Sequence, residues 1–502
     1  MDTHIADEML KELDINEITV KANDRAAERY EIDPEAEKKL LHKLDMHILP
    51  VLWFLYMLAF LDRSNIGTNY HTSHHYSGNA KIQGMTKDLK MTGNDYNIAL
   101  FIFFPSYIIF EVPSNILIKR LAPSTLLSGL MFCWGIITIA QGLVKTKESL
   151  YAMRFLLGFF ESGFFPGCAY LISMYYKRYE LQWRFNIYFT GSIIAGSFSG
   201  LLAYGIAHMD GVQGYGGWRW IFILEGIFTA VVALCGKFFI VDWPEKAKFL
   251  TDDEKRLLIA RLSADVADAK MNRLDKPAMR RIFTDWKMYV GTLMYLGIVN
   301  TGYATSFFTP TILTQLGYKA QAAQVRSIPI FLVAAFFCLV TAYCTDKLRH
   351  RYAFCILGIC IATTGYAMLL AQAMIPVGAR YAAIFLIVTG GYMCQPVTIA
   401  WLANCMSGHY KRSVSSAFQI GFGNLGGIIA SDIFITNEAP GFVTGYAVSL
   451  ALIWVTAIGC TVLLLGLRRE NRKRERGERD WRLETSDADN LGDDHPHFRF
   501  TY

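Results

Sequence analysis

Charged residues are scarce in this chain: only 18% of its 502 residues are Asp, Glu, Lys or Arg, whereas 53% are hydrophobic. Ordinary soluble domains carry about 25% charged residues, so this balance excludes a typical soluble protein. Residues 1–45 are rich in Glu, Asp and Lys and have no apolar core, so no cleavable secretory signal is expected. The composition predicts an integral, multi-pass membrane protein whose first apolar span directs targeting.

Cysteine pairs at metal-binding spacing are also missing. The ten cysteines, among them Cys133, Cys168, Cys338, Cys355 and Cys460, are scattered within the apolar stretches. Scattered cysteines of this kind usually behave as small apolar core residues. We therefore expect no metal site and no cofactor.

Long hydrophobic runs, in contrast, recur along the whole chain. About twelve stretches are close to the length of roughly 20 residues with which a helix crosses a bilayer. They are residues 46–66, 96–117, 121–143, 150–175, 184–207, 218–241, 288–313, 327–343, 353–372, 381–406, 414–436 and 444–467. The predicted fold class is all-α, with twelve transmembrane helices in two six-helix bundles.

The predicted spans divide the chain into five parts. They are an N-terminal tail (1–45), a first bundle (46–241), a charged central linker (242–285), a second bundle (286–467) and a C-terminal tail (468–502). Two similar bundles joined by one linker are typical of carriers whose halves rock around a midplane site. The pattern therefore predicts transport by alternating access.

Basic residues give the orientation. The linker is rich in Lys and Arg from Lys246 to Arg281, and the last span is followed by the run RRENRKRERGERD. The positive-inside rule places the linker and both termini in the cytoplasm. A basic tail could also suggest nucleic acid, but next to a membrane span it is normally an orientation signal or a lipid contact. We expect the lipid bilayer as a partner and no nucleic acid.

Four charged residues inside the spans are the first candidates for function. Arg154 and Glu161 lie in the fourth span, and Asp62 and Arg63 lie near the outer end of the first. A charge near the bilayer centre costs about 2.5–3.5 kcal/mol even on a lenient scale, so such residues usually face a cavity or a partner. Because opposite charges offset each other's desolvation, we expect an Asp62–Arg154 pair.

Glu161 lies seven residues after Arg154, hence about 10 Å deeper on nearly the same helical face. Burial and nearby cations act in opposite directions on a carboxyl group, which can then load and release protons near neutral pH. The alternative is that Arg154 and Glu161 only connect helices through hydrogen bonds.

Uncharged candidates lie in the second half. Asn424 stands among glycines in the eleventh span and could bond a substrate or only a neighbouring helix. Asn404 and Trp401 in the tenth span, and Tyr303 and Phe307 in the seventh, could line a cavity. The alternative for these aromatic residues is ordinary packing.

Several segments in a fixed order resemble one family of transporters. They are FLDRSNIG in the first span, EVPSNILIKR after the second, RFLLGFFESGFFPG in the fourth, GWRWIFILEG into the sixth and DWPEKAKFLTDDEK after it. From about residue 45 to residue 468 the chain is similar to the anion:cation symporter family of the major facilitator superfamily, and in particular to its fungal allantoate, nicotinate and pantothenate permeases. The resemblance implies uptake of a small organic anion driven by a proton gradient.

The resemblance also implies roles for single residues. It makes Asp62 and Glu161 proton-handling carboxylates, Arg63 and Arg154 their partners or anion ligands, and Asn424 a candidate substrate contact. The planar fork of donors on arginine suits a carboxylate substrate. Arg63 and Arg154 therefore compete for two roles, which the sequence does not assign.

One segment departs from the family pattern. Residues 68–77 read TNYHTSHHYS, where family members continue almost directly into a segment like the NAKIQGM that begins here at Asn79. The segment contains three histidines, His71, His74 and His75, which could suggest a metal site or a pH sensor. Their spacing, however, does not match the spacing of common metal ligands. We interpret the segment as a solvated external loop.

The resulting hypothesis is a plasma-membrane proton symporter of a small carboxylate such as nicotinate, pantothenate or allantoate. One alternative is a non-transporting nutrient sensor on the same scaffold, which the modest linker and tail disfavour. An enzyme is not expected, because no nucleophile, base and orienting group stand at plausible spacing. The sequence contains no signal for an oligomeric state or for one particular anion.

Overall fold

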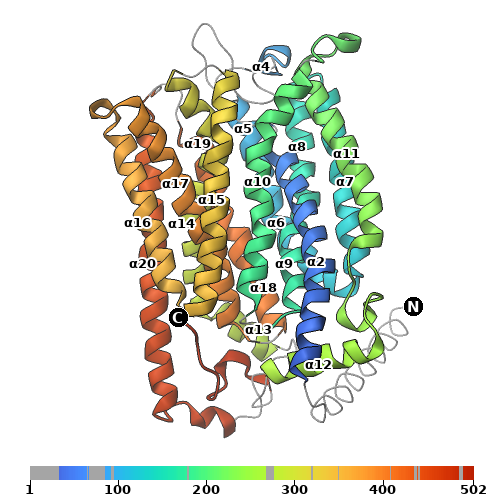
Figure 1. The fold of residues 1–502 in the computed structure, drawn as a ribbon, viewed down its shortest axis with the longest axis vertical. Helices are drawn as coiled ribbons and strands as arrows, with labels where there is room; N and C mark the ends of the chain where they lie inside the picture. The colour runs from blue at the N-terminus through green and yellow to red at the C-terminus, as the bar shows by residue number, and fades with distance from the viewer. Residues whose placement is uncertain are drawn as a thin grey trace.

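The computed structural model of the chain consists of helices and the segments that join them. It describes residues 33–64, 66, 85–91, 95–177, 180–207, 209–266, 276–317, 320–348, 350–407, 409–434, 438, 441–484 and 490–502. Every regular element in these ranges is helical. In Figure 1 the long helices run side by side along the long axis of the molecule, in one group before α12 and another after α13.

The first group holds the elements from α2 to α11. Its bounds are α2 (Pro34–Ser64), α4 (Met85–Asp88), α5 (Asp95–Phe101), α6 (Phe103–Arg120), α7 (Pro123–Leu143), α8 (Lys147–Glu161), α9 (Phe164–Ser173), α10 (Leu181–Ala207) and α11 (Gly217–Phe239), with a 3-10 turn at Val212–Gly214. A second 3-10 turn at Pro244–Lys246, α12 (Asp252–Val266) and α13 (Lys276–Phe283) form the connection to the second group.

The second group holds the elements from α14 to α20. Its bounds are α14 (Trp286–Gln315), α15 (Ala320–Leu348), α16 (Arg351–Leu370), α17 (Val377–Cys405), α18 (His409–Gly423), α19 (Leu425–Asp432) and α20 (Val443–Glu475), with a 3-10 turn at Gln372–Met374. Two more 3-10 turns, Asp480–Glu484 and Gly492–Asp494, lie in the C-terminal tail.

Each expected span coincides with one helix or with two consecutive helices. The pairs are α5–α6, α8–α9 and α18–α19, which a short interruption separates. Among the described residues, eight helical stretches are long and apolar enough to cross a membrane by length and composition: 34–63, 123–143, 147–173, 217–239, 325–348, 351–370, 377–405 and 443–475. The other four expected spans correspond to the interrupted pairs α5–α6 and α18–α19 and to α10 and α14, which carry buried Asn, Ser and Thr residues.

Several helices extend beyond the apolar spans. α2 begins at Pro34 rather than near residue 46, and α20 continues to Glu475 rather than ending near residue 467. Asp33 caps the start of α2 by accepting from the backbone N–H of Glu35 at 3.1 Å. A hydropathy window detects only the apolar part of a helix, so it does not register polar extensions of this kind.

A capping box starts α12 in the linker. Glu254 N–H donates to Thr251 Oγ1 at 3.3 Å, and Thr251 N–H donates to Glu254 Oε2 at 2.8 Å. Asp252, Asp253 and Glu254 in the first turn also match the positive end of the helix dipole. The linker therefore holds helices, although no apolar span was expected there.

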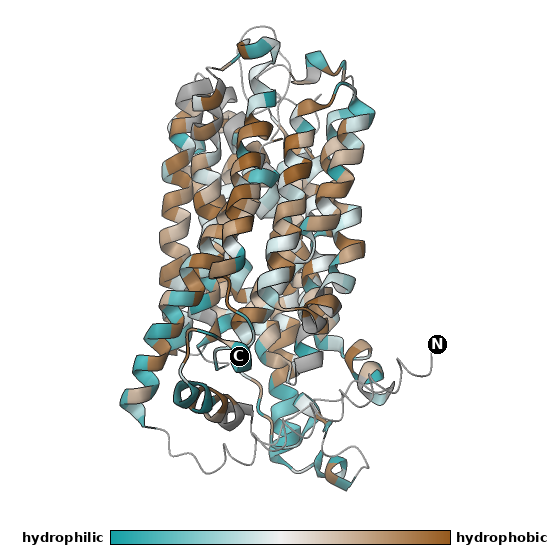
Figure 2. Ribbon diagram, turned by 90° about the vertical axis from the view of Figure 1, so that its right-hand side faces the viewer, coloured by the Kyte–Doolittle hydropathy of each residue, from teal (hydrophilic) through white to brown (hydrophobic). Residues whose placement is uncertain are grey.

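The two ends of the molecule differ in what they contain. The start of α2, α12, α13 and the C-terminus lie at one end, here called the α12 end, and α4 lies at the other, here called the α4 end (Figure 1). Figure 2 shows hydrophobic residues along the middle of the helices and hydrophilic residues toward both ends. This distribution fits a bundle that crosses a bilayer along its long axis.

Helices of the two groups pack on each other along the middle of the molecule. α10 lies against α15, α6 against α18, and α5 against α19. Gly196 in α10 faces the ring of Phe331 in α15, where an added Cβ would lie 3.2 Å from a ring carbon. These contacts surround the site described next.

Candidate functional site

A cavity with an empty volume of about 430 Å³ lies between the two groups of helices. It takes its lining from both groups and is rich in tyrosine. The lining residues are Tyr56, Phe60, Arg63, Tyr107, Phe165, Phe189, Ser192, Tyr295, Gly302, Tyr303, Tyr392, Gln395, Ile420 and Asn424. Three of the residues predicted from the sequence, Arg63, Tyr303 and Asn424, thus meet in one place.

Arg63 is the positively charged residue among those that line this cavity. Its Nη2 and Nε donate to Oε1 of Glu161 at 2.5 and 3.0 Å, and the two side chains are only 11% and 4% exposed. The guanidinium also lies 5.0 Å from the ring centroid of Phe103 and 5.1 Å from that of Tyr107. Carboxylate and aromatic faces together hold the arginine in a largely dehydrated position.

The polar contacts continue into the second group of helices. Arg63 Nη1 donates to the hydroxyl of Tyr303, which in turn donates to Oδ1 of Asn424 at 3.2 Å. Glu161 and Arg63 belong to the first group, whereas Tyr303 and Asn424 belong to the second. One hydrogen-bonded chain therefore crosses from one group to the other at the cavity.

Interruptions of the helices lie next to these residues. Glu161 is the last residue of α8, Asn424 stands between α18 and α19, and Phe103 follows the break between α5 and α6. Discontinuous transmembrane helices are the usual means by which carriers present polar groups at midplane. The candidate site is therefore built where three helix pairs are broken.

Small residues let the helices approach around the site. An added Cβ at Gly158 would lie 2.3 Å from the carbonyl oxygen of Phe103, so α8 contacts α6 through glycine. At Gly427 an added Cβ would lie 2.3 Å from the ring of Phe104 and 2.9 Å from that of Tyr303. The second contact joins α19 to α6 across the two groups.

Asp62 does not lie in this cavity. Its Oδ2 accepts from Trp134 Nε1 at 3.1 Å and from Thr229 Oγ1 at 2.8 Å, and the residue is 2% exposed. The expected Asp62–Arg154 pair is wrong: the ion pair that forms is Arg63–Glu161. Neighbouring residues on a helix point about 100° apart, so Asp62 faces α7 and α11 while Arg63 faces the cavity.

Arg154 is buried in α8 at 2% exposure. Its Nε and Nη2 have no hydrogen-bond partner among the residues that the structure describes. It does not line the central cavity. The structure thus separates the two candidate arginines, since only Arg63 reaches the cavity.

Asn404 lies near the α12 end of α17 at 5% exposure, and its side-chain amide has no hydrogen-bond partner in the described part of the chain. Ala403, its neighbour, lines a second cavity with an empty volume of about 470 Å³. This cavity also lies between the two groups and shares Ile420 with the first. Asn404 therefore belongs to the α12 end and not to the central cavity.

Sequence reasoning missed several lining residues. Tyr107, Tyr295, Tyr392 and Gln395 face the cavity, and none of them was a candidate. Aromatic residues are common in spans, so only their convergence distinguishes them from packing residues. Phe307, which was a candidate, instead stacks on Tyr303 with ring centroids 5.6 Å apart.

Metal binding finds no support in the described residues, where no group of three or more His, Cys, Asp or Glu side chains could hold an ion. The segment 68–77 with His71, His74 and His75 lies outside the described residues.

Comparisons with known proteins agree with this architecture. Residues 52–431 match the model of the Major Facilitator Superfamily. The MFS transporter prlL of a fungal species (strain NRRL 50135) is 34% identical over 447 residues, which cover 88% of this chain and 89% of the relative. The high-affinity nicotinic acid transporter of Saccharomyces cerevisiae is 28% identical, covering 93% and 85%.

A solved structure shows the same fold. The proton:xylose symporter XylE, bound to 6-bromo-6-deoxy-D-glucose, superimposes with a TM-score of 0.66 at 13% identity, covering 85% of this chain and 95% of that one. At this identity the likeness concerns the fold alone, that of an all-helical membrane protein of the same superfamily fold.

Proposed function

This chain belongs to the Major Facilitator Superfamily, and we propose that it is a proton-coupled symporter of a small organic anion. The family makes it a multi-pass membrane transporter. The finer proposal depends on one observation. Arg63 and Glu161 form a buried ion pair, and Arg63 lines a cavity that both groups of helices enclose.

The cavity favours a small carboxylate as substrate. It is lined mostly by aromatic side chains, with Arg63, Gln395 and Asn424 among its polar groups, which is the usual composition of a small-molecule site. Arg63 offers a planar fork of donors that matches a carboxylate, and the tyrosine hydroxyls add donors for a polar or ring substituent. Nicotinate, pantothenate and allantoate fit this chemistry, and a relative named as a nicotinic acid transporter supports an anion of this class. We keep the fungal anion:cation symporter group as the proposed subtype.

Competition for Arg63 supplies the coupling. In the present arrangement Glu161 occupies the Nε and Nη2 donors of Arg63. A proton on Glu161 removes its negative charge and releases these donors to a substrate carboxylate. Binding of the proton and of the anion therefore favour each other, and thermodynamic linkage makes this effect reciprocal. Such linkage is what a symporter requires.

Alternating access is proposed to move this site between the two ends. The Arg63–Tyr303 contact joins the groups, so its exchange for a substrate changes how strongly they are held together. We propose residues 46–241 and 286–467 as the two bundles, linked by 242–285 and flanked by tails 1–45 and 468–502. We also propose that the α12 end is cytoplasmic and that the plasma membrane is the site of action.

The other candidates keep secondary roles in this proposal. Asp62 is a second proton-handling candidate, because it is buried in α2 next to Arg63 and accepts hydrogen bonds from Trp134 in α7 and Thr229 in α11. Arg154 lies on the α4 side of Glu161 and is a candidate for the first contact of an entering anion. Asn404 is a candidate contact on the exit side.

Uptake of labelled nicotinate, pantothenate, allantoate and a dicarboxylate tests the proposal in cells without their own permeases. We expect saturable uptake of one anion, faster at acid external pH and abolished by an uncoupler. Arg63→Lys should lower this uptake about tenfold or more, since an ammonium lacks the fork geometry. Arg380→Lys is the matched control: the Nε of Arg380 donates to the carbonyl of Ile375, which precedes α17, and Arg380 does not line the central cavity. Uptake that continues at the same rate in the presence of the uncoupler would contradict symport.

A further inference from the structure

A buried cluster of four charges outside the central cavity joins Asp493 of the C-terminal tail to Asp285, Lys287 and Lys411. Asp493 accepts from Lys287 Nζ at 2.8 Å through Oδ2, and its Oδ1 lies 2.8 Å from Lys411 Nζ. Asp285 lies 3.0 Å from Lys287 Nζ and 2.7 Å from Lys411 Nζ. The four side chains are between 0% and 7% exposed. Two lysines and two aspartates thus neutralise one another away from water.

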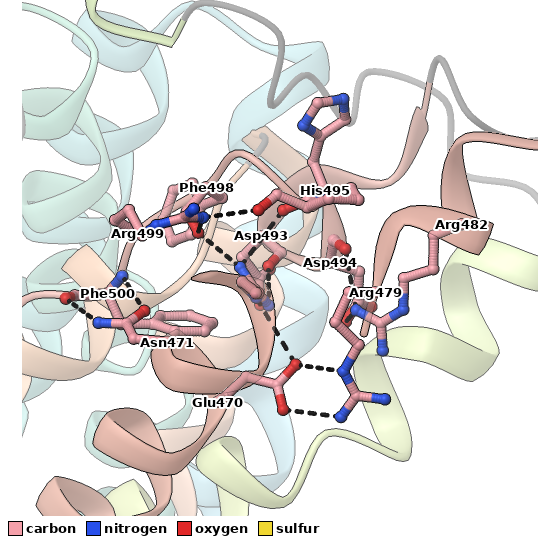
Figure 3. Close-up of polar contacts among 12 residues, drawn as sticks. Glu470, Asn471, Arg479, Arg482, Asp493, Asp494, His495, Phe498, Arg499 and Phe500 are labelled. Carbon is pink, nitrogen blue, oxygen red and sulfur yellow. Dashed lines mark hydrogen bonds and ion pairs between the residues drawn. The ribbon is translucent and has the colours of Figure 1, made fainter. Parts of the chain in front are cut away.

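The rest of the tail segment Asn490–Tyr502, here called the strap, is bound just as closely. Arg474 in α20 donates to the carbonyls of Asp493 at 2.9 Å and Phe498 at 2.8 Å. Asn471 donates to the Phe500 carbonyl at 2.9 Å and accepts from the Phe500 N–H at 3.0 Å. Figure 3 shows Asn471 of α20 beside Phe500 of the strap.

The far end of the strap reaches two more helices. Arg351 at the start of α16 donates its N–H to the Tyr502 carbonyl at 2.7 Å and its Nη1 to Thr501 Oγ1 at 2.8 Å. Trp401 Nε1 in α17 donates to the Thr501 carbonyl at 3.2 Å. The strap therefore contacts α14, α16, α17, α18 and α20, all of which belong to the second group.

One of these helices also borders the path between the groups. Lys411 stands in the first turn of α18, and the next residue, Arg412, lines the second cavity together with Ser416, Ala417 and Ile420. The same helix packs across the groups on α6 and α9. The charge cluster is thus attached to the helix that forms one wall of the cavity at the α12 end.

We propose that the strap is a conformational clamp that ties the α12 end of α18 to α14 and α20, so that the second group moves as one body. The clamp itself does not depend on the proposed function. Only its expected effect on transport rests on that proposal. Loss of Asp493 leaves two buried lysines facing one carboxylate, and breaking a buried ion pair from one side is strongly unfavourable. Release of the strap and loosening of α18 are therefore coupled.

Hydrogen–deuterium exchange on the purified full chain in detergent tests the clamp. In Asp493→Asn we expect the amides of residues 490–502 and of the first turns of α18 to exchange at least about tenfold faster, because the free energy of their local opening falls. Asp494→Asn is the matched control: its carboxylate is 27% exposed and pairs with Arg482 at 3.1 Å, so exchange should stay within about twofold.

A second variant keeps the test decisive if Asp493→Asn does not fold. Asn471→Ala removes both bonds to Phe500 and leaves the four charges in place, so residues 498–502 should exchange faster first, followed by α18. An unchanged strap in both variants, or a loosened strap with α18 unchanged, would overturn the clamp. Anion uptake per molecule at the cell surface should fall severalfold in Asp493→Asn. If no anion is taken up even by the wild type, the proposed function fails while the exchange data still decide the clamp.

Discussion

At the scale of single residues, two neighbours on one helix have separate surroundings. Asp62 accepts from Trp134 and Thr229 inside the first group, whereas Arg63 reaches Glu161 and the cavity. The sequence identified both as charges that need a partner. Its expected Asp62–Arg154 pair is wrong, whereas it left the role of Arg63 open. Depth along a span follows from residue number, but the direction of a side chain also depends on how the helix is rotated against its neighbours.

Glu161→Gln tests the coupling role at this scale. Glutamine keeps the shape of the side chain but neither carries a negative charge nor exchanges a proton, so Arg63 loses its anionic partner. We expect anion uptake by this variant to be the same at acid and neutral external pH, with exchange of internal for external anion retained. The measurement is the ratio of initial uptake rates at the two pH values.

Glu148→Gln is the control for that measurement. Glu148 lies in the first turn of the same helix, exposed, and should keep the wild-type ratio of rates. If Glu161→Gln kept the wild-type ratio as well, Glu161 would no longer be a coupling site, and Asp62 would become the first candidate.

At the scale of elements, the interrupted helices decide where the polar groups meet. Ser162 and Gly163 separate α8 from α9, and Asn424 separates α18 from α19. Glycines stand on both sides of Asn424, and the break between α18 and α19 lies there. The break after Glu161 was not anticipated, because hydropathy shows one continuous apolar stretch across it.

Gly427→Ala tests the contact between α19 and α6. The added methyl would lie 2.3 Å from the ring of Phe104, so the arrangement in which these helices touch should become less stable by about 1–3 kcal/mol. We expect the uptake rate to fall about tenfold at an unchanged amount of protein in the membrane.

Gly129→Ala in α7 is the matched control, since nothing lies within 4 Å of an added Cβ there. A helical Gly→Ala change in open space is usually favourable. Equal uptake by the two variants would show that the close approach at Gly427 is not needed in the transport cycle.

At the scale of the whole molecule, two buried charge centres should respond differently to pH. In the strap, burial raises the pKa of Asp493, but the ammonium groups of Lys287 and Lys411 outweigh burial and hold this pKa well below its usual range. A lowered carboxyl pKa contributes stability above the unfolded value of about 3.9, and this stability is lost as the pH falls through the lower, folded value.

Exchange of residues 490–502, corrected for the intrinsic pH dependence of amide exchange, should therefore show constant protection from about pH 5 to pH 8. Transport should change over the same interval if Glu161 carries the proton. Loss of strap protection between pH 8 and pH 5 would contradict the ionised state of Asp493.

The amino-acid sequence by itself determined the membrane class, the all-helical fold and the superfamily, because hydropathy and ordered motifs are local properties of the chain. It also singled out Arg63, Glu161, Tyr303 and Asn424 as residues whose types suit an anion and a proton. Only the tertiary structure decided that these four form one chain across two groups of helices, that Asp62 faces elsewhere, and that the tail closes on Lys287 and Lys411. The physical reason is that such contacts join residues up to 240 positions apart, and helix rotation and packing, which no local pattern encodes, bring them together.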